Sequence, residues 1–211
     1  MTEPIPRLTA ARSDVEIIEA TTPFERFLRV DTIRFRHRLF SGELSAAHTY
    51  DVLRQGAAAA IVLYDPDQDA VVLIEQFRLP ALLAGSAPWQ LEVVAGLVDG
   101  DEAPQVVAVR ETREETGLVL NGELIPIQRY LPSCGASDES VHLFCARIDA
   151  SAAGGVHGSV AEGEDIRTVV KTVTEIEALI DAGAIENGHS LVALYWLLRH
   201  HDELRRRWSQ V

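Results

Sequence analysis

The chain has few cysteines, few basic residues and no long apolar run. Its 211 residues include two cysteines and no Cys-x-x-Cys pair, so neither a disulfide framework nor a zinc site is expected. No stretch approaches the roughly 20 apolar residues that span a bilayer, and the N-terminus lacks the apolar core of a signal peptide. These absences predict reduced thiols, no membrane association and a cytoplasmic location.

Acidic residues outnumber basic ones by 32 to 19, which gives a formal net charge of -13. Binding to nucleic acid depends on Lys and Arg that neutralise phosphates, so nucleic acid is not an expected partner. An acidic protein that handles phosphate groups usually recruits a cation. With 47% hydrophobic residues, the chain can bury one sizeable core and carry a small appendage.

The sequence pattern changes near Gly56. Before it, residues 14–20 and 27–40 alternate charged and apolar side chains, which predicts antiparallel strands with one wet face. After it, apolar runs at 57–64 and 70–78 predict a covered hairpin. The alternation of strands and helices predicts an α/β fold, with one domain at 1–56 and a second at 57–211. Further strands are expected at 89–98, 124–131, 140–148 and 168–174, a loop at 150–165, and helices at 174–183 and 190–208.

Residues 102–116 are expected to form a helix. Asp101 is the predicted cap, Pro104 is tolerated in a first turn, and Gly117 stands where a left-handed terminator is expected. The helix is expected to rest on the core through Val106, Val107 and Val109.

Three glutamates share one face of this helix. Glu111 and Glu115 are four residues apart, and Glu114 follows Glu111 by three. Like charges at this spacing repel by a few tenths of a kcal/mol per pair, and such a set often holds a divalent cation. Carboxylate oxygens suit Mg²⁺, which commonly bridges carboxylates to phosphates. The alternative is a solvated helix with Glu–Arg pairs.

The segment GLVDGDEAPQVVAVRETREETGL, from Gly96 to Leu118, has the residues of the Nudix box at their fixed spacings, apart from Thr112, where an aliphatic residue is usual. The chain therefore resembles the Nudix hydrolase superfamily. The resemblance implies an α/β/α sandwich with a mixed sheet, preceded by a small N-terminal antiparallel β domain. It also implies site roles: Glu111, Glu115 and the Ala95 carbonyl as metal ligands, Glu114 as a ligand or near-ligand in the catalytic group, and Arg110 as the residue that orients the glutamates.

The segments RFRHRLFSGELS, VVLIEQFR, LEVVAG and GEDIRTVV extend the resemblance to the bacterial ADP-ribose pyrophosphatases. This similarity implies hydrolysis of the diphosphate linkage of ADP-ribose to AMP and ribose 5-phosphate. The implied cofactor is Mg²⁺, as two or three ions, with Mn²⁺ as a substitute. By position, Glu162 corresponds to the general base and Glu164 to a further metal ligand, with a solvated acidic loop as the alternative. A homodimer with exchanged N-terminal domains is also implied.

The same similarity implies six substrate contacts, although each of these residues could equally have an ordinary packing or surface role. They are Phe27 and Leu28 at the adenine, Asp51 and Arg78 near the nucleotide and diphosphate, Leu97 through its backbone, and Glu139 at the terminal ribose.

Two features leave the substrate open. Tyr50 and Gln55 stand in a stretch where ADP-ribose pyrophosphatases are often basic, and Cys134 interrupts a usual Ser-Pro-Gly loop. Another nucleotide sugar, such as GDP-mannose, is therefore the alternative substrate. A non-catalytic domain that senses ADP-ribose is a further alternative, but it is disfavoured because the box glutamates are all retained.

Overall fold

The computed structural model describes residues 14–159 and 163–208. The chain divides into two compact units. One unit contains the residues up to Gly56 together with Ser133–Glu139, and the other contains Ala57–Pro132 and the residues from Ser140 onward.

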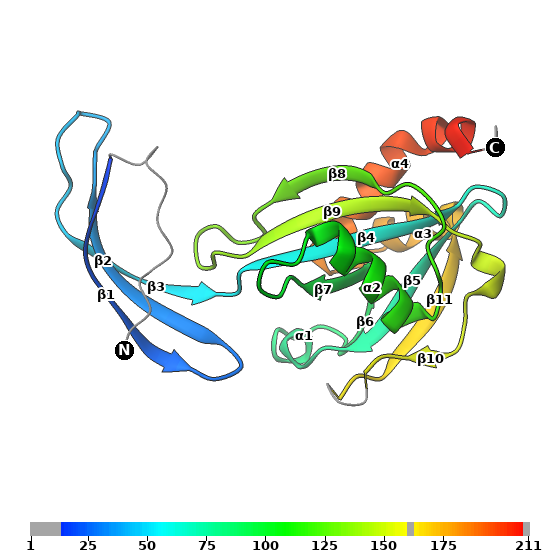
Figure 1. Ribbon diagram of the computed structural model, residues 1–211, viewed down its shortest axis with the longest axis horizontal. Coiled ribbons are helices and arrows are strands. Elements are labelled where there is room, and N and C mark those ends of the chain that lie inside the picture. Colours follow the sequence, from blue (N-terminus) through cyan, green and yellow to red (C-terminus); the bar gives the residue numbers. More distant parts are fainter. Residues whose placement is uncertain (1–13, 160–162, 209–211) are drawn as a thin grey trace. The chain divides into compact units, whose positions relative to one another are not determined.

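The N-terminal unit is a three-stranded antiparallel sheet in the order β1-β2-β3 (Figure 1). Its strands are β1 (Val15–Glu25), β2 (Arg29–His37) and β3 (His48–Arg54). No residue of β1 is fully buried. Residues 133–139 join this unit, because Leu53 N donates to Ala136 O at 2.9 Å and Asp138 N donates to Leu53 O at 3.1 Å. The predicted antiparallel pairing of these strands is confirmed.

The second unit is built on an eight-stranded mixed sheet. Its main path runs β10-β11-β5-β4-β9-β8, with β6 paired to β5 and β7 paired to β4; the β4–β9 pair is parallel and the others are antiparallel. The strands are β4 (Ala57–Asp65), β5 (Ala70–Phe77), β6 (Trp89–Glu92), β7 (Val94–Leu97), β8 (Ile125–Tyr130), β9 (Ser140–Arg147), β10 (Val156–His157) and β11 (Ile166–Thr172). The helices are α1 (Leu79–Leu83), α2 (Pro104–Thr116), α3 (Val173–Asp181) and α4 (Gly188–Trp208), with a 3₁₀ turn η2 (Ala150–Ala152).

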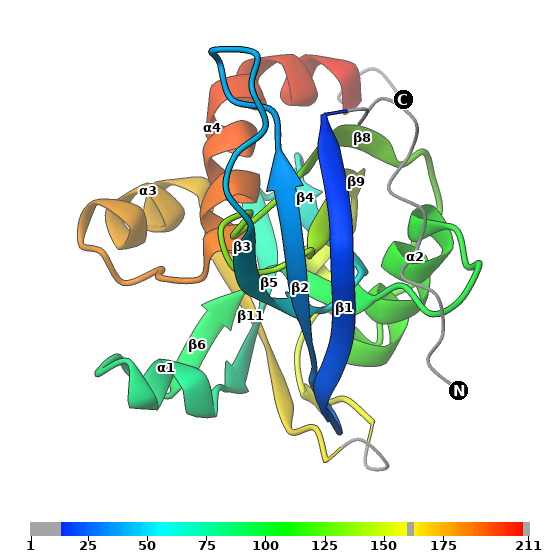
Figure 2. The same ribbon diagram turned by 90° about the vertical axis from the view of Figure 1, so that its left-hand side faces the viewer.

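Helices cover both faces of this sheet, with α2 on one face and α3 and α4 on the other (Figure 2). Strand β4 shows why the run AAAAIVLY is apolar throughout. Its even-numbered residues, such as Val62, pack in the core with α4, while its odd-numbered residues, such as Ile61, pack in the core with α2. A strand buried on both faces needs apolar side chains at every position. The predicted α/β/α sandwich with a mixed sheet is confirmed.

Four local predictions are wrong. Residues 89–98 form two strands instead of one, because the chain leaves β5 at Val93 and continues against β4. Helix α2 starts at Pro104, after Ala103, and no side chain caps it, so Asp101 is not the cap. The expected terminator is confirmed, since Gly117 has a φ of 70°. The stretch expected to be a loop at 150–165 contains η2 and β10.

The fourth wrong prediction concerns the valines of α2. Val107 is fully buried, but Val106 is 54% and Val109 40% exposed. Each residue of a helix turns by about 100°, so these two valines lie on the side away from the sheet. None of the described helices is both long and apolar enough to cross a membrane.

Candidate active site

Helix α2 places two carboxylates against the edge of β7. Glu115 is 2% exposed, and its Oε2 accepts a hydrogen bond from Ala95 N at 3.3 Å. Glu111, one turn earlier, is largely buried, while Glu114 is exposed. The helix therefore turns two acidic side chains toward the backbone of Ala95 and Gly96.

Gly96 makes this close approach possible. A Cβ atom at this position would lie 2.0 Å from Glu111 Oε1 and 2.2 Å from Glu111 Cδ. Any larger residue would displace the Glu111 carboxylate. The glycine is thus required by space rather than by its backbone angles.

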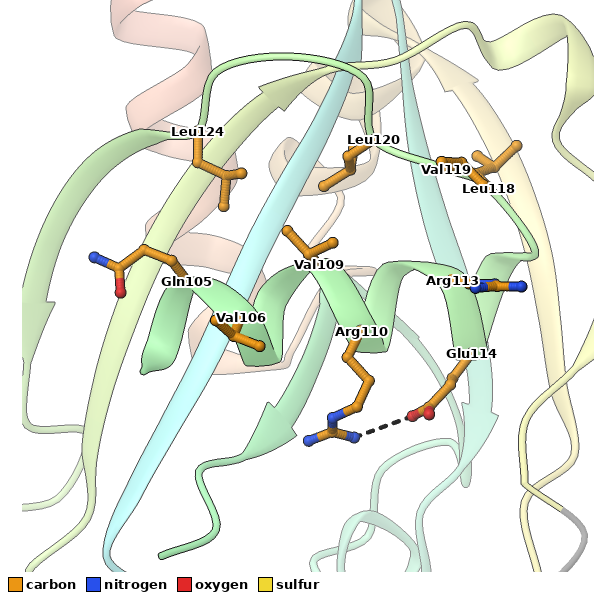
Figure 3. Close-up of a pocket in the computed structure, with 10 residues that line it drawn as sticks. All are labelled: Gln105, Val106, Val109, Arg110, Arg113, Glu114, Leu118, Val119, Leu120 and Leu124. Carbon is orange, nitrogen blue, oxygen red and sulfur yellow. Dashed lines mark hydrogen bonds and ion pairs between the residues drawn. The ribbon is translucent and has the colours of Figure 1, made fainter. Parts of the chain in front are cut away.

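Arg110 fixes the orientation of the surrounding glutamates. Its Nη1 donates to Glu111 Oε1 at 2.8 Å and to Glu114 Oε2 at 3.1 Å, and its Nη2 donates to Glu102 Oε2 at 3.4 Å. Figure 3 shows the contact between Arg110 and Glu114. These contacts place Arg110 where it can hold acidic side chains in position around the site.

Arg78 forms a two-pronged ion pair with Glu92. Its Nη2 donates to Glu92 Oε2 at 2.8 Å and its Nε donates to Glu92 Oε1 at 3.0 Å. Glu92 is 4% exposed, and Arg78 follows the end of β5. Burial opposes the charge of Arg78, but Glu92, Glu115 and Glu164 outweigh it and raise the pKa of the guanidinium. Arg78 is therefore a fixed cation beside the carboxylates.

Glu164 lies just before β11 and is half-buried. Its Oε2 accepts a hydrogen bond from Ser159 N at 2.9 Å. The negative charge of Glu164 contributes to raising the pKa of Glu111, of Glu115 and of Arg78. The structure thus brings Glu164 into the same electrostatic group as the two helix carboxylates and Arg78.

This group holds an excess of negative charge. Burial raises the pKa of Glu115 to about 9, and the charges of Glu111 and Glu164 contribute to the increase. Burial also raises the pKa of Glu111 to about 7, with Glu114 and Glu164 adding to it and Arg110 opposing it. Buried acids with such raised pKa values mark candidate functional sites.

The donor set fits a hard divalent cation. Carboxylate oxygens and a backbone carbonyl are the ligands that Mg²⁺ prefers. Within residues 14–159 and 163–208, no three His, Cys, Asp or Glu side chains gather into a ready ligand cluster. A cation would remove the repulsion between carboxylates that adds to the effect of burial in raising the pKa of Glu111 and Glu115.

The other predicted site residues have these positions. Leu97 ends β7 and is half exposed. In the N-terminal unit, Phe27 and Leu28 are exposed between β1 and β2, and Asp51 Oδ1 accepts from Thr32 Oγ1 at 2.6 Å. The backbone N of Glu139 donates to Ser137 Oγ at 3.0 Å. Glu162 lies outside the described residues.

The sequence did not point to Glu92 as the partner of Arg78. The signal was present, because Glu92 is a charged residue within the apolar run WQLEVV, and a buried charge needs a partner. Identifying the partner required the pairing of β5 with β6, which places Glu92 opposite Ile74.

A separate cavity of about 780 Å³ lies on the outer side of α2 (Figure 3). Val106 and Val109 line it from the helix, and Leu120 and Leu124 line it from the chain that follows. Arg110 and Glu114 also line it. The cavity is mainly apolar and does not include the buried carboxylates Glu111 and Glu115.

Residues 54–192 match the model of the NUDIX domain, and the chain belongs to that family. It is 38% identical over 202 residues to an ADP-ribose pyrophosphatase of Escherichia coli, with 96% of each chain covered. It is 35% identical over 151 residues to a GDP-mannose pyrophosphatase of Citrobacter koseri, covering 71% of this chain and 78% of that protein. The fold is similar to a solved structure described as an ADP compounds hydrolase, with a TM-score of 0.67 and 18% identity, covering 91% of this chain and 98% of the other.

Proposed function

We propose that this protein is an enzyme that hydrolyses the diphosphate linkage of ADP-ribose to AMP and ribose 5-phosphate with Mg²⁺, with the cytoplasm as its predicted compartment. The observation that carries the proposal is that Glu111 packs against Gly96 while the buried Glu115 accepts a hydrogen bond from Ala95 N and acts electrostatically on Arg78. The choice of ADP-ribose is supported by relatives with that activity in their names, whose similarity extends over nearly the whole chain.

In this proposal, Glu111, Glu115, Glu164 and the carbonyl of Ala95 would hold two or three Mg²⁺ ions, with Mn²⁺ as a substitute. Bound there, the ions would supply neutralisation of phosphate charge and activation of water. Arg110 would keep the carboxylates oriented through its contacts with Glu111 and Glu114. Among the described residues, Arg78 uses Nε and Nη2 on Glu92, which leaves Nη1 to bind a phosphate oxygen.

We assign the proton transfer to Glu162, with Glu114 as a ligand or near-ligand of the metal. The contacts with the organic part of the substrate remain those implied by family resemblance. They are Phe27 and Leu28 at the adenine, Asp51 near the nucleotide, Leu97 through its backbone and Glu139 at the terminal ribose.

A homodimer with exchanged N-terminal units is part of this proposal. Its support is the number of large apolar side chains that the three-stranded sheet and its turns leave exposed, which is unusual for a surface without a partner. These residues are Val15, Ile17, Ile18, Phe24, Phe27, Leu28, Leu39, Phe40, Leu44 and Tyr50.

The test compares release of phosphate from ADP-ribose and from GDP-mannose, using a coupled phosphatase, with and without Mg²⁺. We expect Mg²⁺-dependent turnover of ADP-ribose that falls by orders of magnitude in Glu115→Gln and Glu162→Gln. Circular dichroism of both variants should match the parent protein, because the substitutions preserve side-chain volume. Normal turnover by Glu115→Gln would refute the assignment of the metal site.

GDP-mannose stays as the second candidate substrate. Tyr50 and Gln55 place a neutral surface where ADP-ribose pyrophosphatases are often basic. A higher kcat/KM for GDP-mannose than for ADP-ribose would select this candidate. Tight ADP-ribose binding without turnover of either compound would instead indicate a sensing domain, although the retained glutamates argue against it.

A further inference from the structure

Two buried side-chain oxygens in the second unit have no hydrogen-bond partner among the described residues. They are Gln76 Oε1 and Thr168 Oγ1, in residues that are 8% and 7% exposed. Buried polar atoms in folded proteins nearly always have partners, so each exception needs an explanation. The two residues differ in their distance along the sheet from the carboxylate site.

Strand register places Gln76 beside that site. Gln76 lies opposite Ile166 on β11 and opposite Gln90 on β6. Since side chains alternate along a strand, Gln76 shares a face with Ile74, whose side chain belongs to the core under α2.

The chain beyond Gln76 on β5, and the chain before Ile166 on β11, lead to residues of the site. Arg78 follows Gln76 by two residues, just beyond the end of β5, and Glu164 precedes Ile166 by two, just before the start of β11, so both lie at the ends of the two strands that carry this pair. The charge of Glu164 also acts on Arg78, as expected if the two side chains are neighbours. Gln76 is therefore the last residue of β5 on this face before the charged group begins.

The chemistry of the surrounding groups limits what the Gln76 carbonyl can bind. With a cation bound, the carboxylates of Glu92, Glu115 and Glu164 would be acceptors only, and Arg78 is assigned to Glu92 through Nε and Nη2 and to a phosphate oxygen through Nη1. A carbonyl oxygen needs a donor. Water in the hydration shell of a cation is such a donor, because its oxygen faces the ion and its hydrogens point outward.

We propose that Gln76 Oε1 accepts a hydrogen bond from water bound to the cation at the Glu111–Glu115–Glu164 site, so that Gln76 is a positioning residue for the hydrated ion. The inference rests on the proposed metal-dependent function and assigns Gln76 a role within it. Residues that orient groups around a metal typically change its affinity or the activity 10-fold to 100-fold when they are replaced.

The test uses Gln76→Met, which removes the carbonyl at similar volume, and Thr168→Val as a matched control. The control also removes a buried oxygen without a partner from the same face, but at a position opposite Ile74, farther from Arg78. The full-length protein is titrated with Mn²⁺, and free Mn²⁺ is followed by electron paramagnetic resonance. Melting temperatures are measured in EDTA, and kcat and KM for ADP-ribose are measured across Mg²⁺ concentrations.

We expect both variants to melt at or above the parent temperature in EDTA, since each loses an unsatisfied polar atom. Gln76→Met should weaken Mn²⁺ binding about tenfold or more and raise the Mg²⁺ concentration for half-maximal turnover by a similar factor. Thr168→Val should change neither. Parent-like Mn²⁺ affinity in Gln76→Met would overturn the inference. A parent protein that binds Mn²⁺ but hydrolyses no ADP-ribose would overturn the proposed substrate and leave the Mn²⁺ comparison decisive for Gln76.

Discussion

Gly96 and Glu111 are matched in size at the centre of the site. Because a Cβ atom at Gly96 would overlap the Glu111 carboxylate, Gly96→Ala should push that side chain away and lower kcat/KM for ADP-ribose about 10-fold to 100-fold. The overlapping atoms are the end of a flexible side chain, so the melting temperature should change little. Gly122→Ala is the control, since nothing lies within 4 Å of its Cβ position. Equal activity in the two variants would contradict this account of Gly96.

The sequence could predict the carboxylates of the site but not all of their neighbours. Glu111 and Glu115 are encoded by local spacing, because helix geometry places residues four apart on one face. Arg78 and Glu92 meet across paired strands, and the unpartnered oxygen of Gln76 depends on what β11 and β6 place beside it. Contacts of this kind depend on strand register, which one sequence does not determine.

At the scale of the element, helix α2 buries one of two neighbouring valines that look equivalent in the sequence and leaves the other exposed. Val107→Ala should lower the free energy of unfolding by about 2 kcal/mol, because it removes two methyl groups from a fully buried side chain. Val106→Ala should be neutral or stabilising by about 0.5 kcal/mol, because Ala has the higher helix propensity at an exposed position. Urea denaturation measures both values. Similar losses in the two variants would show that Val106 also packs in a core.

The turn between β4 and β5 is tied to helix α4 through Asp69. Asp69 Oδ1 accepts from Tyr64 Oη at 2.7 Å and contacts His201 Nε2 at 2.5 Å. Burial raises the pKa of Asp69, but these hydrogen bonds outweigh it and hold the pKa below its ordinary value. At pH values above the ordinary pKa of Asp, the ionised Asp69 carboxylate therefore stabilises the fold. This contribution is lost as the pH falls through the lower pKa that Asp69 has in the folded protein.

Asp69→Asn should accordingly lower the free energy of unfolding by about 1 kcal/mol at pH 7, and the deficit should shrink below about pH 4. Asn keeps the positive φ of 50° accessible, so backbone strain does not contribute. Asp67→Asn in the same turn is the control, because Asp67 forms an exposed ion pair with Arg147 that should contribute little. Urea denaturation between pH 7 and 3.5 gives the comparison, and a deficit that does not vary with pH would exclude the electrostatic explanation.

At the scale of the whole molecule, the sheet could be predicted from the sequence, but some of its details could not. Residues 57–64 and 70–78 predicted their hairpin because strands covered on both faces are continuously apolar. The break at Val93 and the attachment of residues 133–139 to the N-terminal unit were not predictable. Both depend on which distant strand the backbone meets, and the side-chain pattern does not carry that information.

The N-terminal sheet needs a source of stability other than a core of its own. Three strands with no fully buried residue in β1 have little core, and so small a sheet needs a covering surface. We expect sedimentation equilibrium to give a dimer. If the N-terminal unit of one subunit also completes the site of the other, two inactive variants should complement each other. Glu115→Gln is expected to disable the carboxylate site and leave the N-terminal unit intact, and Phe27→Ala combined with Asp51→Ala is expected to do the reverse.

Co-expression of these two variants with different affinity tags, followed by purification through both tags, isolates the mixed dimer. One of its two sites then combines an intact carboxylate site with an intact N-terminal unit from the other subunit, so turnover of ADP-ribose should reach about half of the parent value. Each variant purified alone should remain inactive and provides the baseline. If each N-terminal unit serves its own chain, the mixed dimer contains no complete site and should be as inactive as its parents. Recovered activity would therefore show that a second copy of the chain is part of the catalytic unit.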